Sequence, residues 1–183
     1  SCHFHQSEFH SQDTKQIKSI QLANLKSFDY RTQLCEKIDK GVLKKISLKA
    51  HKNLILDTDR FINLRLYIHN KKDRPLLIVY PISRGRYHLA KFVAKSFYKR
   101  GWNTIIVERE TQYEKIYDPQ KLNLQMNELV FDNRQIVDWL YQEKLFSIKK
   151  LAMFGISKGA IKTSLIMADD PRIDAAVMAL GGG

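Results

Sequence analysis

The fold is decided by the stretch Lys150-Leu151-Ala152-Met153-Phe154-Gly155-Ile156-Ser157-Lys158-Gly159-Ala160-Ile161. An apolar run typical of a buried strand ends near Ser157, and an apolar helical pattern follows it. Gly155 and Gly159 lie two residues before and after the serine, in the spacing G-x-S-x-G. At a very sharp strand-to-helix turn the two elements pass close together, so side chains at both positions would collide and glycine is needed. The pattern predicts a strained turn that holds the Ser157 hydroxyl above the end of the sheet, at a helix N-terminus that favours negative charge.

The same spacing also occurs by chance, and an ordinary tight turn between a strand and a helix is the alternative interpretation. The context favours the strained turn, because residues 151–154 are strand-like and residues 160–168 are helix-like. With this context the sequence resembles the α/β-hydrolase superfamily, in which Ser157 would take the position of the nucleophile.

The patterns before and after this turn agree with the resemblance. Residues 42–50 and 61–68 alternate between apolar and polar side chains, which predicts antiparallel strands with one solvent-exposed face. Residues 88–100 form an amphipathic pattern that Gly101 ends, with Leu89, Phe92, Val93 and Phe97 on the apolar face. In the family's order, the third to sixth strands would be residues 75–80, 103–108, 149–154 and 173–180. The side chains expected in the sheet core are Leu77, Val79, Ile105, Val107, Leu151, Met153, Ala176 and Met178.

The resemblance covers residues 41–183 and implies the fold class. We expect a three-layer α/β sandwich of α/β-hydrolase type, with a mostly parallel sheet, helices on both faces, and the C-terminal strands of that fold missing. Residues 1–40 are expected to form a polar leader with short helical segments, one of them around Leu34 and Ile38, which lie four residues apart. Residues 111–125 are polar and predict a loop excursion, and Asp132 is a candidate N-cap for a helix that otherwise begins near Asn127.

The resemblance also implies an oxyanion hole. Its first donor would be the backbone amide of Lys158, and the second would come from the loop after the third strand, from Ile82 or Ser83. Many family members carry His-Gly where this chain has Pro81-Ile82, which leaves the exact second donor open. Arg84 and Arg86 lie in the same loop and either contact an anionic substrate or are solvated.

A base and an orienting acid are the missing parts of the expected chemistry. The family places the acid and then the histidine after the serine. All six histidines precede Ser157, and they are His3, His5, His10, His51, His69 and His88. His88 lies nearest the expected site, at a helix start, where a capping or surface role is the alternative. Asp169, Asp170 and Asp174 follow the serine, but at the helix end and strand start that lie away from catalysis, so turn roles are expected.

The interpretation is therefore an incomplete serine hydrolase for a small-molecule acyl ester, thioester or amide, inactive on its own and completed by a missing C-terminal part. One alternative is a non-catalytic α/β-hydrolase-like binding or scaffold protein. Another is a basic domain that binds polyanions. The residues indicate no cofactor and no metal site, although His3, His5 and His10 are closely spaced in what is otherwise a polar leader.

Composition and charge narrow the other classes of protein that this chain could belong to. The chain has 183 residues, enough for one domain with a core, and no apolar run near the ~20 residues that span a bilayer. It carries 31 Lys and Arg against 19 Asp and Glu, a formal charge of +12, which favours anionic partners. However, there is no basic-aromatic RNA motif, helix-turn-helix or zinc-ligand spacing, so a solvated basic surface is expected.

The first two residues raise the question of localisation. Ser1-Cys2 looks like the end of a bacterial lipobox, in which the cysteine after the cleavage site is lipidated and tethers the protein to a membrane. The apolar signal that would precede it is not part of this sequence, and a trimmed chain can begin anywhere. The two readings predict a lipoprotein of the cell envelope or a cytoplasmic protein.

Overall fold

The computed structural model describes residues 28–51, 59–82, 87–108, 119–143 and 148–180. They form a mixed sheet of seven strands in the order β1-β2-β3-β5-β4-β6-β7. The strands are β1 (Tyr30–Ile38), β2 (Gly41–Lys49), β3 (Phe61–His69), β4 (Leu76–Tyr80), β5 (Asn103–Val107), β6 (Leu151–Ile156) and β7 (Ala175–Ala179).

The sheet has an antiparallel half and a parallel half. The pairs β1–β2, β2–β3 and β3–β5 are antiparallel, and the pairs β5–β4, β4–β6 and β6–β7 are parallel. All strands except β1 and β3 therefore run in one direction within this mixed sheet. The carboxyl ends of β4 and β6 lie together, with Tyr80 paired in register with Gly155.

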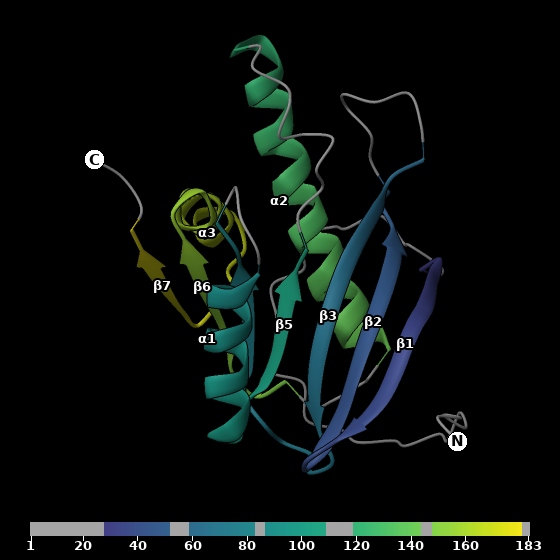
Figure 1. Ribbon diagram of the computed structural model, residues 1–183. Helices are drawn as coiled ribbons and strands as arrows, with labels where there is room; N and C mark the ends of the chain where they lie inside the picture. The colour runs from purple at the N-terminus through teal and green to yellow at the C-terminus, as the bar shows by residue number, and fades with distance from the viewer. Residues whose placement is uncertain (1–27, 52–58, 83–86, 109–118, 144–147, 181–183) are drawn as a thin grey trace.

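Helices cover both faces of this sheet (Figure 1). Helix α1 (His88–Lys99) packs on one face, where Ala90, Val93 and Ala94 bury against apolar side chains of the central strands. Helices α2 (Pro119–Gln142) and α3 (Lys158–Asp169) pack on the other face, through side chains such as Trp139 and Ile166. The three-layer α/β architecture expected from the sequence is confirmed.

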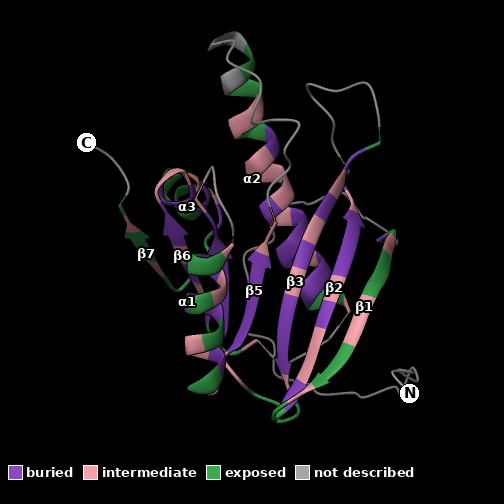
Figure 2. Cartoon of the chain, viewed as in Figure 1, coloured by how far each residue is buried: buried purple, intermediate pink, exposed green. Residues whose placement is uncertain are grey.

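The core lies in the centre of the sheet, as the burial colours show (Figure 2). β4 is buried along its whole length, because helices cover it on both sides. Of the eight side chains expected in the core, Leu77, Val79, Ile105, Leu151 and Met153 are buried. Val107 and Ala176 are only partly buried and pack against the core. Met178 was wrongly assigned to the core and is 50% exposed, because β7 is the outermost described strand on its side.

The helix expected around Leu34 and Ile38 is wrong, because these residues belong to β1. β1 and β2 form a hairpin in which Ile38 pairs with Gly41, and Lys40 in the turn has a positive φ of 62°. Pairing with a neighbouring strand therefore overrides the weak helical spacing. Residues 30–38 consequently belong to the same sheet as β2–β7, and of the leader expected over residues 1–40, residues 1–27 lie outside the described residues.

Two expectations for the helices also need correction. The chain is helical from Pro119, so part of the expected excursion is helix, and Asp132 lies in the middle of α2 and is not an N-cap. In α1 the predicted apolar face is shifted, because Val93 is buried while Phe92 is 68% exposed and Leu89 44% exposed. Within the described residues, no helix combines the length and the apolar character that a membrane crossing requires.

Candidate active site

Ser157 occupies the turn between β6 and α3. Its backbone has φ 55° and ψ −119°, a conformation that side chains rarely adopt and that stores strain. Its backbone N–H donates a hydrogen bond of 2.8 Å to the Ala179 carbonyl oxygen at the end of β7, which fastens the turn to the sheet. The outlying conformation predicted for Ser157 is confirmed.

The two glycines are required by the close approach of neighbouring backbones. A Cβ atom on Gly155 would lie 2.6 Å from the carbonyl carbon of Gly159, and closer still to Thr163 Oγ1. A Cβ atom on Gly159 would lie 2.8 Å from the carbonyl oxygen of Pro81 and 2.9 Å from the carbonyl carbon of Tyr80. All three distances are shorter than real Cβ contacts allow, so the turn cannot be this tight with any side chain at either position.

The hydroxyl of Ser157 is not used to cap the helix that follows it. A serine at an N-cap usually accepts a hydrogen bond from a first-turn amide, but within the described residues the Ser157 side chain makes no such bond. Its carbonyl oxygen instead accepts from the Ala160 N–H at 2.8 Å. Ser157 therefore stands at the N-terminal, positive end of α3, directly before Lys158, with a hydroxyl that makes no capping bond among the described residues.

The loop after β4 reaches the same turn. Tyr80 and Pro81 are buried, and their carbonyl groups are the atoms that crowd Gly159. Ile82 follows directly and is half-buried against the α1 side of the core. The carbonyl groups of Tyr80 and Pro81 therefore lie at the start of α3, and Ile82 is the next residue along the chain. Ser83, Arg84 and Arg86 lie outside the described residues.

A buried polar layer supports this end of the sheet, and the sequence analysis missed it. Arg60, just before β3, makes two hydrogen bonds of 2.5 Å and 2.7 Å to the Asp132 carboxylate on α2. Burial raises the pKa of Asp132, although Arg60 opposes this shift. The Tyr80 hydroxyl donates to Asn133 Oδ1 at 2.9 Å, and burial, with a smaller contribution from Asp132, raises the pKa of Tyr80 well above its usual value. These contacts tie α2 to the strand ends next to Ser157.

No protein-family model matches the sequence, and no curated protein matches it. Solved structures do resemble it. A glucuronoyl esterase from Solibacter usitatus has a TM-score of 0.63 at 13% identity, over 86% of this chain and 53% of that one. A putative acetyl xylan esterase from Bacteroides fragilis has a TM-score of 0.61 at 14% identity, over 81% and 46%. A cold-adapted esterase from an Arctic intertidal metagenomic library has a TM-score of 0.61 at 15% identity, over 82% and 64%.

The chain has the α/β-hydrolase fold. The strand order, with β4 and β6 adjacent and a serine at a strained turn after β6, agrees with the resemblance seen in the sequence. The chain spans about half the length of the first two of these solved structures.

In this α/β-hydrolase fold, the described histidines do not gather around Ser157. His69 lies at the opposite edge of the sheet, where its Nε2 is 2.8 Å from the Tyr98 carbonyl oxygen. His51 follows β2, which is separated from β6 by three strands, or about 19 Å at the usual strand spacing. His88 is exposed and is the first residue of α1. Because α1 follows the loop after β4, His88 begins at the same edge of the sheet as Ser157. His3, His5 and His10 lie outside the described residues.

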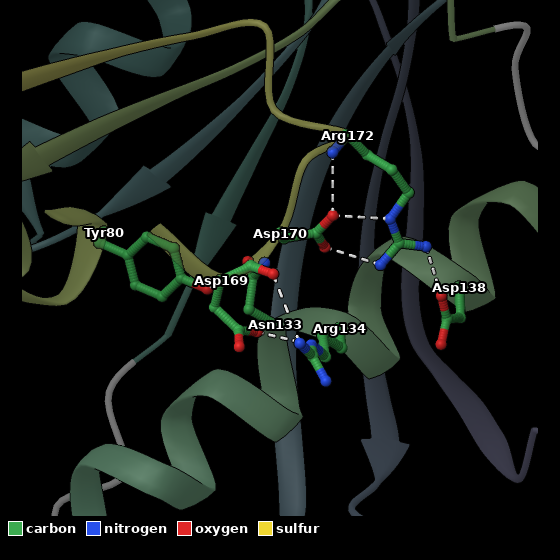
Figure 3. Close-up of polar contacts among 7 residues, drawn as sticks. All are labelled: Tyr80, Asn133, Arg134, Asp138, Asp169, Asp170 and Arg172. Carbon is green, nitrogen blue, oxygen red and sulfur yellow. Dashed lines mark hydrogen bonds and ion pairs between the residues drawn. The ribbon is translucent and has the colours of Figure 1, made fainter. Parts of the chain in front are cut away.

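The three acidic residues after Ser157 have structural contacts, as expected, and those of Asp169 and Asp170 are drawn in Figure 3. Asp170 accepts hydrogen bonds from the Arg172 backbone and side chain, and Arg172 also pairs with Asp138 on α2. Burial alone would raise the pKa of Asp170, but Arg172 outweighs it and lowers the pKa. Asp169 pairs with Arg134, and Asp174 accepts the Leu151 N–H at the start of β6.

The sequence offered only weak signals for the polar layer. Asp132 and Asn133 stood out as polar residues before an apolar helical run, but their partners Arg60 and Tyr80 are distant in sequence and carry no spacing signal. Among the described residues, no three His, Cys, Asp or Glu side chains lie together as a metal site would require.

Proposed function

We propose that this chain is part of a serine hydrolase in which Ser157 is the nucleophile. The observation that carries the proposal is the strained turn at Ser157, with φ 55°, glycines on both sides and a hydroxyl that caps nothing. A tight turn with no chemical role has no need of a strained serine, because a glycine adopts positive φ without cost. Strain of this kind is typical of residues that hold a reactive group in place.

The proposed reaction is acyl transfer through a covalent intermediate. The Ser157 oxygen attacks the substrate carbonyl carbon while a base takes the hydroxyl proton. The backbone amide of Lys158, with that of Ile82 or Ser83, donates hydrogen bonds to the oxyanion that forms. Collapse of this tetrahedral intermediate expels the alcohol or amine, which takes the proton from the base. Water then attacks the acyl-serine, releases the acid and restores the Ser157 hydroxyl.

An ester is the substrate that we favour over a thioester or amide. The support is that the three similar solved structures described above are esterases by name. Two of those names refer to carbohydrate-derived esters, so an acyl group on a sugar is a suitable first substrate to test. We propose that Arg84 and Arg86, in the loop that follows Ile82, contact an anionic part of the substrate.

We further propose that the acid and the histidine come from outside these 183 residues. The support is that His51 stacks on Phe28, that His69 contacts Tyr98, and that the acids after Ser157 are engaged at the far ends of their elements. Without a base, serine is a weak nucleophile at neutral pH. The chain of 183 residues is therefore expected not to turn over esters.

The test compares p-nitrophenyl acetate hydrolysis by four proteins: residues 1–183 and the chain extended by the residues that follow Gly183 in its gene, each with Ser157 and with Ser157→Ala. We expect equal background rates for the two short proteins and a loss of about a thousandfold or more on Ser157→Ala in the extended one. Labelling of the extended protein by a fluorophosphonate should also require Ser157. Full activity of the extended Ser157→Ala protein would contradict the proposal.

The second candidate is a non-catalytic protein that uses the α/β-hydrolase fold for binding. The observation that favours it is that no described histidine contacts Ser157. A stop codon directly after Gly183 would favour this candidate, whereas a downstream acid and a later histidine would favour the enzyme. Ester turnover by residues 1–183 that vanishes in Ser157→Ala would contradict both this candidate and the expected inactivity, and His88 would become the candidate base.

A further inference from the structure

Positive charge gathers at the edge of the sheet opposite Ser157. We call this surface the basic edge, and define it by Lys40, Lys71, Lys72, Arg74, Lys99 and Arg100. They lie in the β1–β2 turn, in the β3–β4 loop and at the C-terminal end of α1. These segments are adjacent, because the Asn70 N–H donates to the Lys40 carbonyl oxygen at 2.9 Å and the Tyr98 hydroxyl donates to the Asp39 carbonyl oxygen at 2.7 Å.

Little negative charge offsets the basic edge. Asp39 and Asp73 lie among its residues, and Asp73 is already 3.7 Å from a further lysine, Lys149. Beside them Lys150 pairs with Asp174 at 3.1 Å. All six side chains except the half-buried Arg74 are exposed, and within the described residues no ion pair involves any of the six. The excess of positive charge therefore faces solvent.

The edge at which Ser157 lies is different. There Lys49 pairs with Asp59 at 2.8 Å and Arg65 pairs with Glu108 at 2.8 Å, whereas Lys121 and Lys158 have no ion pair among the described residues. Among the described residues, the cations without an ion pair are therefore more concentrated at the basic edge. An uneven distribution orients a protein on an oppositely charged partner.

We propose that the basic edge docks the protein on an anionic lipid surface. Four of the six residues are lysines, whose flexible point charges suit a diffuse layer of headgroups, whereas arginine is preferred where a phosphate is gripped by two hydrogen bonds. Trp102 lies directly after Arg100 and Gly101, half-buried, with its ring edge-on to Phe97 at 5.4 Å. Tryptophan with one apolar and one wet side is favoured at the level of lipid headgroups.

A nucleic acid is the less suitable partner for this surface. Single strands are bound by aromatic rings that stand free to stack with bases, but Trp102 and Phe97 pack against each other. The basic residues also come from several loops across an edge and do not follow one helix or strand, as they would along a groove-binding element.

Docking in this way would fix the direction in which Ser157 faces. The parallel strands run from the basic edge to the Ser157 turn, and β6 has six residues, a length of about 20 Å. The bound protein would therefore hold Ser157 about 20 Å above the headgroups, facing the solution. This inference stands without the proposed hydrolase activity.

The test is co-sedimentation of residues 1–183 with phosphatidylcholine vesicles, with and without phosphatidylglycerol at roughly three lipids in ten. We expect binding only to the anionic vesicles, and loss of binding at high salt. Each lysine near such a surface contributes about fivefold in affinity, so Lys71→Ala/Lys72→Ala should weaken binding about thirtyfold. The matched control is Lys49→Ala/Lys121→Ala, which removes the same charge away from the basic edge and should change binding by less than about threefold.

Tryptophan fluorescence gives a second readout, because the chain has only Trp102 and Trp139 and Trp139 is fully buried. A blue shift on adding anionic vesicles that disappears in Trp102→Phe would support docking at the basic edge. Equal weakening by the two double variants would overturn it, because net charge alone would then explain binding. Retention by duplex DNA without retention by anionic vesicles would also overturn it, in favour of a nucleic-acid partner.

Discussion

Gly159 has no room for a methyl group, because the carbonyl groups of Tyr80 and Pro81 lie against its α-carbon. Gly159→Ala should therefore force the loop after β4 away from α3 and lower the free energy of unfolding by about 1–3 kcal/mol. Urea denaturation of the purified protein measures this. The control is Ser164→Ala, at an exposed position on the same helix, where a change within about 0.5 kcal/mol is expected. An equally small loss for Gly159→Ala would mean that the helix does not approach the loop this closely.

At the level of single residues, the Arg60–Asp132 ion pair is a second feature that can be tested. The Arg60 side chain is 1% exposed, so Asp132→Ala would leave a buried guanidinium without this carboxylate. We expect a loss of about 3–5 kcal/mol in unfolding free energy. The double variant Arg60→Met/Asp132→Leu, which removes both charges and keeps the volume, should be less destabilised than Asp132→Ala. If the double variant is less stable than Asp132→Ala, the unpaired charge of Arg60 is not the reason for the loss of stability in Asp132→Ala.

These two features differ in how far the sequence could predict them. The Gly155-Ser157-Gly159 turn was predicted because its cause is local: one spacing between a strand and a helix requires one backbone conformation. The Arg60–Asp132 and Tyr80–Asn133 contacts were missed because each joins residues more than 50 positions apart. Two polar residues that meet only after folding leave no pattern in a single sequence.

At the scale of elements, Asp170 and Arg172 join the end of α3 to α2 through Asp138 (Figure 3). The pKa of Asp170 is lowered in the folded protein from its usual value of 3.8. A lowered acid pKa stabilises the fold above the unfolded value, and this stabilisation is lost as the pH falls through the folded value. The free energy of unfolding should therefore decrease from about pH 4 downward.

The variant Asp170→Asn isolates this contribution. At neutral pH it should lower the free energy of unfolding by about 1.5–3 kcal/mol, because Arg172 loses a charged hydrogen-bond partner. As the pH falls below the usual carboxyl pKa of 3.8, the difference from the natural chain should shrink, since protonation of Asp170 progressively removes that partner. Denaturation curves measured from pH 2.5 to pH 7 test the sign. A difference that stays constant over this range would assign the loss to packing and not to charge.

The elements themselves were predicted unevenly. β4, β5 and β6 carry continuous apolar runs and α1 has a strong period, so their positions followed from the residues. β1 was mistaken for a helix because its strand character depends on β2, which pairs with it through a turn at Asp39 and Lys40. The first half of α2 was read as a loop because it is polar, and its residues Lys121, Asn123 and Leu124 are exposed in the folded chain.

For the whole molecule, the two outer strands of the described sheet differ in character (Figures 1 and 2). β1 presents Arg31, Glu36 and Lys37 to solvent, and charges of this kind prevent the pairing of sheet edges. β7 is apolar, with Val177 52% and Met178 50% exposed, and within the described residues it pairs only with β6. An apolar, unpaired strand of this kind favours pairing between molecules.

The last prediction follows from this contrast. Residues 1–183 should self-associate as their concentration is raised, and Val177→Lys should reduce the association because a charge on the exposed strand opposes pairing. Light scattering at equal concentrations measures the effect, and urea denaturation checks that the variant is folded. The matched control is Thr32→Lys in β1, which adds the same charge at the opposite edge and should leave the association unchanged. If both variants reduce it equally, the added charge itself acts by repulsion, and the β7 edge is not where the molecules meet.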